Sequence, residues 1–137
     1  MSGVPEETTT GVQFAKLIGI EWIDADPDGA RARVEVREEL LQPFGILHGG
    51  VMSSLVESIC SYATAGVVYD EGMAAMGQSI NVSFLRPVSE GSIEVRARAR
   101  HRGRTTWVWD AEVRDSADRL CALSQMTIAV RPRPDRA

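Results

Sequence analysis

The amino-acid sequence predicts an α+β domain in which a five- or six-stranded antiparallel sheet wraps around one long central helix. Two observations support this fold class. The segment from about residue 50 to residue 69 lacks proline and places apolar residues at helical spacing. Four later segments alternate apolar and polar residues with the period of two that is typical of strands. Their short connections favour an antiparallel meander.

Length and composition fit one globular domain. The chain has 137 residues, of which 44% are apolar and 25% are charged, so it can bury a core and is unlike a disordered chain. We expect a single domain over residues 11–131, a flexible N-terminal tail over 1–10 and a C-terminal tail over 132–137. The net charge of −4 gives no reason to expect electrostatic binding to nucleic acid or to an anionic membrane.

Location and redox state are inferred from what the sequence contains. No continuous apolar run reaches the roughly 18 residues of a membrane-spanning helix, and the first residues (MSGVPEETTT) do not resemble a signal peptide. Cys60 and Cys121 are too few for a disulfide framework or a zinc site. We therefore expect a reduced, cytoplasmic protein with no metal.

The individual elements follow from local patterns. Residues 12–17 have a short helical pattern that Gly19 ends, and the turn sequence 26–29 separates two short strands. Residues 40–49 are apolar but contain proline and glycine, which predicts a buried or half-buried loop. The four later strands are expected at about residues 79–84, 93–100, 105–113 and 120–130.

The long helix is unusually apolar. Its main stripe consists of Val51, Leu55, Ile59, Tyr62 and Gly66. Its other faces are also mostly uncharged, so we expect the helix to be buried rather than to lie on the surface.

Glu57 is the first candidate for a catalytic group, because it is the only formal charge between His48 and Asp70. A carboxylate in an uncharged helix is costly to bury unless it is paired or functional. The alternative is a helix register that places Glu57 at a solvent edge, and the pattern alone leaves both interpretations open.

The sequence His48-Gly49-Gly50 lies directly before the same helix. Two glycines allow a ligand or another backbone to approach closely, and the first N–H groups of a helix are free to bind a developing negative charge, as in an oxyanion hole. A plain turn into the helix would have the same sequence. Gln42 lies six residues before His48, and Ser61 lies four residues after Glu57, on the same helical face.

The stretch LQPFGILHGGVMSSLVESICSYAT resembles the motif of hotdog-fold acyl-CoA thioesterases. It is most similar to the branch that contains the Arthrobacter-type 4-hydroxybenzoyl-CoA thioesterases and the phenylacetate-pathway thioesterases. The branch pattern falls here on Gln42, His48, Gly49, Glu57 and Ser61. The segments SINVSFLRPV (79–88) and Gly103-Arg104-Thr105 are similar to later strands of the family, so the resemblance extends over about residues 11–131.

The resemblance implies hydrolysis of an aryl- or medium-chain acyl-CoA to the free acid and CoA, with CoA present only as part of the substrate. In this interpretation the Gly49 N–H is the oxyanion hole, and Glu57 either attacks the carbonyl or activates a water. Gln42 would polarise the carbonyl or hold the water, and Ser61 would orient Glu57 or that water. His48 would fix the loop by a hydrogen bond.

The resemblance also implies a homodimer in which two sheets join edge to edge and two helices lie side by side. Gly49 and Gln42 would come from one chain, and Glu57 and Ser61 from the other. Homotetramers made of two such dimers are common in this branch. Residues expected to contact CoA are Gly50, Arg104, Thr105 and Arg86.

Other functions fit the same residues less well. A hotdog-fold hydratase or dehydratase would pair His48 with Glu57, but Gln42 and the HGG sequence fit the thioesterase pattern better. A non-catalytic acyl-CoA-binding protein would not need Glu57. The alternating arginines of 96–104 also occur in nucleic-acid surfaces, but the same alternation is typical of a solvated strand face. Cys60 is expected to be a core thiol.

Five aromatic residues are either lining for an aromatic acyl pocket or ordinary core residues. They are Phe44, Tyr62, Phe84, Trp107 and Trp109. The core interpretation is favoured for each of them, so these residues do not select an aromatic over an aliphatic acyl group.

Overall fold

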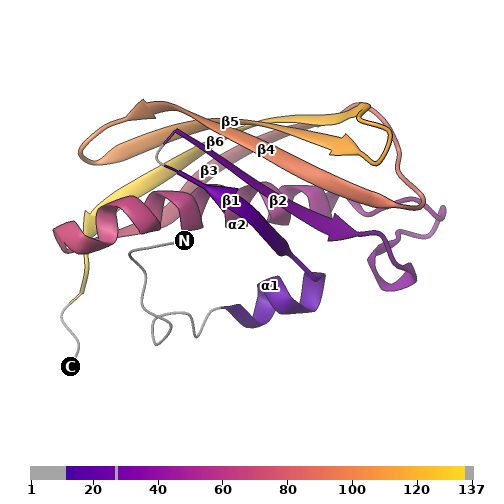
Figure 1. The fold of residues 1–137 in the computed structure, drawn as a ribbon, viewed down its shortest axis with the longest axis horizontal. Helices are drawn as coiled ribbons and strands as arrows, with labels where there is room; N and C mark the ends of the chain where they lie inside the picture. Colours follow the sequence, from indigo (N-terminus) through magenta and orange to yellow (C-terminus); the bar gives the residue numbers. More distant parts are fainter. Residues whose placement is uncertain (1–11, 27, 135–137) are drawn as a thin grey trace.

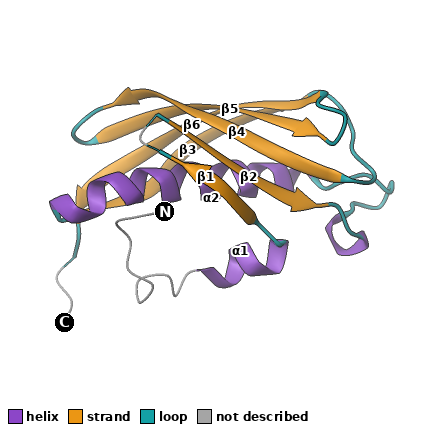
Figure 2. Cartoon of the chain, viewed as in Figure 1, coloured by secondary structure: helices purple, strands orange, loops and turns teal. Residues whose placement is uncertain are grey.

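In the described part of the chain, residues 12–26 and 28–134 of this computed structural model, one long helix lies across one face of a six-stranded antiparallel sheet (Figure 1). The predicted tail at 1–10 lies outside the described residues. The helices are α1 (Val12–Ile18) and α2 (Gly49–Val68), with single 3-10 turns η2 (Glu38–Leu40) and η3 (Tyr69–Glu71). The strands are β1 (Glu21–Ala25), β2 (Gly29–Glu35), β3 (Met73–Phe84), β4 (Ser92–Arg102), β5 (Thr106–Asp115) and β6 (Leu120–Pro132). Figure 2 shows α1 and α2 on the same side of the sheet.

The strands are ordered β1-β2-β4-β5-β6-β3, and all neighbours are antiparallel. The predicted fold class is therefore confirmed. The expected meander of the last four strands holds for β4, β5 and β6 but is wrong for β3, which pairs with β6 at the far edge. Residues 85–91 cross the ends of β6 and β5, where the Leu85 N–H donates to the Cys121 carbonyl (2.8 Å) and the Ser92 N–H donates to Ser116 Oγ (2.8 Å).

The hydrophobic core lies between α2 and the inner face of the sheet. Side chains of α2 that are buried there are Val51, Met52, Leu55, Val56, Ile59, Cys60, Ala63, Thr64 and Val68. The expectation that α2 is buried holds for the side that packs on the sheet. Within α2 only Gly50 and Glu57 are exposed, and Glu57 lies at the edge of the sheet beside β3. The segment Gly49–Glu71 has the length and hydropathy of a membrane-crossing helix, but half of its most apolar 18 residues are buried in the fold, as in a core helix.

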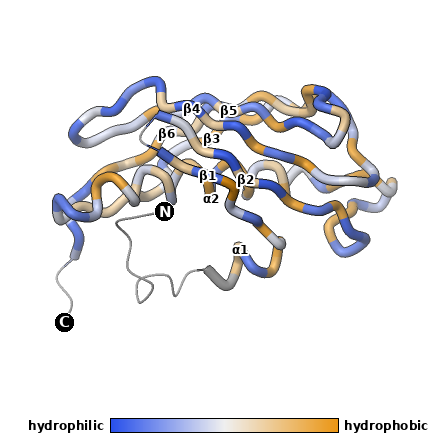
Figure 3. The backbone as a smooth tube through the Cα atoms, in the orientation of Figure 1, coloured by the Kyte–Doolittle hydropathy of each residue, from blue (hydrophilic) through white to orange (hydrophobic). Residues whose placement is uncertain are grey.

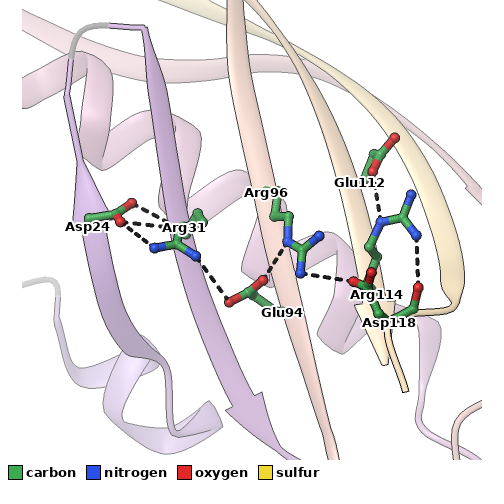
Figure 4. A network of polar contacts seen from close by, with 7 residues as sticks. All are labelled: Asp24, Arg31, Glu94, Arg96, Glu112, Arg114 and Asp118. Carbon is green, nitrogen blue, oxygen red and sulfur yellow. Dashed lines mark hydrogen bonds and ion pairs between the residues drawn. The ribbon is translucent and has the colours of Figure 1, made fainter. Parts of the chain in front are cut away.

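Arg96, Arg98 and Arg100 of β4 lie on the outer face of the sheet, as the strand pattern predicts, and the β4–β5 hairpin is hydrophilic (Figure 3). A register shift between Ala99 and His101 turns Arg102 to the side of Trp107, where the pattern is wrong. Most of these charges are paired. Asp24, Arg31, Glu94, Arg96 and Asp118 form a chain of ion pairs across the face, which Arg114 and Glu112 extend (Figure 4). The hydrogen bond from Arg31 lowers the pKa of the Asp24 carboxyl. Such exposed pairs add little stability, and they leave little unpaired positive charge for a polyanion.

The C-terminal end of β6 extends into the predicted tail at 132–137. Pro132 is still paired with Met73, and the Arg133 N–H donates to the Gly72 carbonyl (2.9 Å). The Arg133 guanidinium lies over the Tyr69 ring, 4.1 Å from its centroid. The first residues of that segment therefore pack on the fold, and 135–137 lie outside the described residues.

One buried hydrogen bond joins α2 to the middle of the sheet. The Trp109 indole Nε1–H donates to Thr64 Oγ1 (2.9 Å), and the Thr64 hydroxyl donates to the Cys60 carbonyl (2.7 Å). Both Trp109 and Thr64 are fully buried. Thr64 follows Glu57 by about two turns, so the bond that fixes the rotation of α2 also fixes the direction in which Glu57 points.

Replacing Thr64 by valine keeps the shape of the side chain but leaves the Trp109 N–H buried without an acceptor. We expect Thr64→Val to lower the free energy of unfolding by about 1–3 kcal/mol in urea titrations. Thr64→Ser retains the hydroxyl and is the matched control, with a smaller loss. Equal losses in the two variants would show that the hydrogen bond does not contribute.

Candidate active site

The N-terminus of α2 is organised by His48. Its Nδ1 accepts the Gly50 N–H (2.8 Å), its carbonyl accepts the Val51 N–H (3.0 Å), and its own N–H donates to the Leu40 carbonyl (2.9 Å). The first N–H groups of a helix have no acceptor within the helix, and no other described group accepts the Gly49 N–H. Of the first three N–H groups of α2, only that of Gly49 is therefore available to a ligand.

Both glycines at this position are explained by neighbouring side chains. A Cβ on Gly49 would lie 2.8 Å from Cζ of Phe84, and a Cβ on Gly50 would lie 2.8 Å from Nδ1 of His48. The sequence suggested instead that they allow a ligand or a backbone to approach. Phe84 covers Gly49 from β3, and the Gly50 N–H is already bonded to His48.

The loop before α2 places Gln42 at the same end of the helix. The Gln42 N–H donates to the Ile46 carbonyl (2.8 Å), and the Leu47 N–H donates to the Val88 carbonyl (2.6 Å), which ties the loop to the segment after β3. Oε1 of Gln42 accepts the Phe44 N–H, which leaves the Nε2 group as its free donor. Phe44, expected to be half-buried or more, is 91% exposed at the loop tip.

Glu57 lies about two turns further along α2, against strand β3. Its Oε1 is 2.8 Å from the point where a Cβ of Gly77 would lie. Within the described residues, no hydrogen bond or ion pair engages its carboxylate, and the residue is exposed. In this chain alone, Glu57 thus lies at a solvent edge, the second of the two interpretations left open above. Ser61 is half-buried one turn on, at the same side of α2.

The structure does not bring all the predicted catalytic residues together in one chain. Gly49 and Gln42 share the N-terminal end of α2, whereas Glu57 lies about 12 Å further along the helix axis and Ser61 further still. One thioester carbonyl must lie within about 3 Å of both an oxyanion donor and the attacking group. The predicted catalytic residues therefore fall into two separate groups on each chain.

The residues expected to contact CoA also divide into two groups. Arg104 and Thr105 lie in the β4–β5 hairpin, and Arg104 lines a cleft of about 430 Å³ with Val67 and Val68 at the C-terminal end of α2. The Thr105 carbonyl accepts a hydrogen bond from Arg131 (2.6 Å). Arg86 follows β3 at the opposite end of the sheet, about 30 Å away by the length of β5.

The remaining candidates have structural positions. Cys60 is buried, and burial raises the pKa of its thiol, so it is not a ready nucleophile. Trp107 and Trp109 are core residues, and Tyr62 stacks on Trp22 with ring centroids 4.9 Å apart. Within residues 12–26 and 28–134, no three His, Cys, Asp or Glu side chains gather as metal ligands.

Sequence reasoning missed two contacts at this site, that of Phe84 with Gly49 and that of Gly77 with Glu57. Gly77 did carry a signal, because a glycine inside a strand often marks a close approach. Nothing in the local pattern indicated that Phe84 would cover the helix N-terminus, since this contact joins β3 to α2.

The cap formed by His48 is testable through stability. We expect His48→Ala to lower the free energy of unfolding by about 1 kcal/mol, because the Gly50 N–H loses its acceptor. His48→Asn supplies another capping acceptor and should recover most of this loss in the same urea titration. Wild-type stability in His48→Ala would show that the Nδ1 contact does not hold the helix start.

Comparison with known proteins identifies the family. The model of the Thioesterase superfamily matches residues 44–122. A 1,4-dihydroxy-2-naphthoyl-CoA hydrolase of Listeria monocytogenes is 34% identical over 116 residues, which cover 85% of this chain and 94% of the relative. The proofreading thioesterase EntH of Klebsiella pneumoniae is 32% identical over 113 residues, 82% of each chain.

Comparison with solved structures gives the same family. The crystal structure of a thioesterase from Haemophilus influenzae matches with a TM-score of 0.85 and 32% identity, over 96% of this chain and 93% of that chain. The two groups of predicted catalytic residues thus lie on a fold shared with a thioesterase along almost its whole length. The chain belongs to the thioesterase superfamily, has its hotdog fold and is a thioester hydrolase.

Proposed function

We propose that two copies of this chain form an acyl-CoA thioesterase whose active site lies between them. The observation that carries the proposal is the Gly49 N–H, the one free donor among the first three N–H groups of α2. In the proposed site it binds the thioester oxygen, and the Glu57 carboxylate comes from the other copy. This arrangement accounts for the distance of about 12 Å that separates Gly49 from Glu57 within one chain.

Strand β3 supports an edge-to-edge dimer. It has 12 residues, it ends the sheet, and its outer edge offers unpaired backbone groups. Two apolar side chains of its inner face, Ile80 and Phe84, remain 38% and 54% exposed. The other edge, β1, has five residues and a register shift, so it is a poor pairing edge. Antiparallel pairing of two β3 strands reverses the second α2, so Gly49 of one copy can approach Glu57 of the other.

The chemistry needs only water as co-reactant. The Gly49 N–H and the positive end of the α2 dipole stabilise the negative charge that develops on the carbonyl oxygen. Glu57 either attacks the carbonyl carbon, forming a mixed anhydride that water then hydrolyses, or takes a proton from the attacking water. In both routes the C–S bond breaks, CoA leaves as a thiolate that is then protonated, and the free acid is released.

The other polar residues have supporting roles in this proposal. The free Nε2 of Gln42 donates to the carbonyl or to the water, and the Ser61 hydroxyl orients the Glu57 carboxylate one turn away. His48 shapes the helix start through its bond to the Gly50 N–H. Because that bond occupies Nδ1, it counts against the hydratase alternative, in which His48 would be a catalytic base.

The substrate is proposed to be an aryl- or medium-chain acyl-CoA. The Phe84 ring supplies an apolar wall beside Gly49, and a relative with 34% identity is named as a hydrolase of an aromatic acyl-CoA. The CoA nucleotide is proposed to lie between residues of both copies. Arg104 and Thr105 come from one copy, and antiparallel pairing brings Gly50 and Arg86 from the other. We further propose a cytoplasmic homotetramer made of two such dimers.

Removing the Glu57 carboxylate tests the reaction. We expect Glu57→Ala and Glu57→Gln to lower kcat by at least about a hundredfold, because α2 has no other charged side chain that could replace the carboxylate. The measurement is thiol release from a panel of aryl and aliphatic acyl-CoAs, which also ranks the acyl groups. Glu90→Gln, at an exposed carboxylate after β3, is the control and should retain wild-type turnover. Near-wild-type turnover in both Glu57 variants would eliminate the assignment.

Mixing two variants, each impaired in a different half-site, tests the shared site. Glu57→Ala and Gln42→Ala chains, exchanged at random, form mixed dimers in which one of the two sites has both groups intact. We expect activity to recover to as much as about a quarter of the wild-type value. If both half-sites acted within one chain, every site in the mixture would keep one defect and activity would not recover.

A further inference from the structure

We infer that Gly77 is a positioning residue of the active site: by lacking a side chain, it leaves the space on β3 in which the Glu57 carboxylate lies. The inference rests on the proposed catalytic role of Glu57. It concerns a residue of β3 that does not itself touch the thioester.

Contacts around Gly77 define that space. A Cβ at this position would lie 2.8 Å from Oε1 and 3.5 Å from Cδ of Glu57, and 2.7 Å from Cε of Met126. The two shorter separations are below any ordinary contact of a real Cβ. A methyl group at position 77 therefore requires the carboxylate and the methionine end to move.

Backbone conformation does not explain the glycine. The described glycines with a left-handed φ, which disfavours other residues, are Gly19, Gly45, Gly72 and Gly91. Gly77 is not among them, and it lies inside a strand, where glycine is disfavoured for its flexibility. Space for the ends of the Glu57 and Met126 side chains is the reason that remains, and of these two only Glu57 carries a reactive group.

A β-bulge next to Gly77 sets which way this position faces. Gly77 is paired with Ile128 and Ser79 with Thr127, so Gln78 is an extra residue opposite the β6 ladder. In a regular strand, residues 77 and 80 would face opposite sides of the sheet. Because of the bulge, Gly77 and Ile80 both face the side on which α2 lies. Bulges commonly redirect side chains beside active sites. Here the bulge places a position without a side chain opposite Glu57.

An alanine at 77 should alter chemistry more than stability. The atoms it would meet are the ends of two flexible side chains, which can shift without moving the backbone. A carboxylate that attacks a carbonyl or a water, however, acts only over a narrow range of positions, and a displacement of about 1 Å costs up to about a hundredfold in rate. The substitution should therefore separate kcat from KM and from the melting temperature.

The first experiment compares Gly77→Ala with Gly29→Ala on the best acyl-CoA of the panel. Gly29 also lies in a strand without a left-handed φ, and its Cβ would meet the Ala97 carbonyl at 3.3 Å, away from Glu57. We expect Gly77→Ala to lower kcat by about 10- to 100-fold with KM changed less than about threefold. Its melting temperature should stay close to that of the wild type, and Gly29→Ala should keep the wild-type kcat.

A second measurement asks whether Gly77 acts through Glu57. Glu57→Asp shortens the side chain by one methylene and withdraws it from position 77. In the Glu57→Asp background, adding Gly77→Ala should therefore lower kcat by less than about threefold, so the two effects are strongly non-additive. If Gly77→Ala alone is destabilised by its contact with Glu57, the same background also relieves that contact, whereas the contact with Met126 stays.

The outcomes are distinguishable. Wild-type kcat in Gly77→Ala, equal losses in both backgrounds, or unfolding in both backgrounds would overturn the inference while leaving the role of Glu57 intact. Wild-type turnover in Glu57→Ala would instead overturn the proposed function itself. Loss in Gly77→Ala that disappears in the Glu57→Asp background supports the positioning role.

Discussion

Packing of α2 against the inner face of the sheet is the interaction on which the rest of the structure depends. It buries nine side chains of the helix, and the bond from Trp109 to Thr64 fixes how the helix is rotated. That rotation turns Glu57 toward β3, and the helix start presents the Gly49 N–H at the other end of the same element. One packing arrangement therefore sets the directions of both proposed reactive groups.

Three glycines around this helix serve a common purpose, because each leaves room for a particular side chain. Gly49 admits the Phe84 ring, Gly50 admits the His48 imidazole, and Gly77 admits the Glu57 carboxylate. The first two shape the helix N-terminus so that a single N–H remains free. Gly77 lets the carboxylate lie close to the strand that forms the proposed dimer edge.

A single chain carries the two proposed half-sites, Gly49 with Gln42 and Glu57 with Ser61, and its own fold holds them apart. α2 is rigid, so Gly49 and Glu57 stay about 12 Å apart however the loops move. The long unpaired edge of β3 offers the means of joining them, since a second copy paired there runs in the reverse direction. The proposed catalysis therefore depends on the proposed dimer. A chain that cannot pair through β3 would lack a complete site.

Local patterns were sufficient for much of this protein. The helical spacing of 50–69 and the period-two strands predicted the fold class, and the alternating arginines of β4 were correctly assigned to a solvated face. The spacing of Gln42, His48, Gly49 and Glu57 indicated the family that the comparisons then established. These features are encoded within a few residues of one another, so periodicity and motif spacing report them directly.

Only the tertiary structure decided which elements meet. It placed β3 beside β6 instead of β4, left one side of α2 uncovered, and brought Phe84 to Gly49 and Gly77 to Glu57. Alternation along a strand shows that one face is buried but not which strand lies beside it, and the bulge at Gln78 changes the facing side within β3 itself. Contacts between distant segments depend on strand order and register, which no local pattern contains.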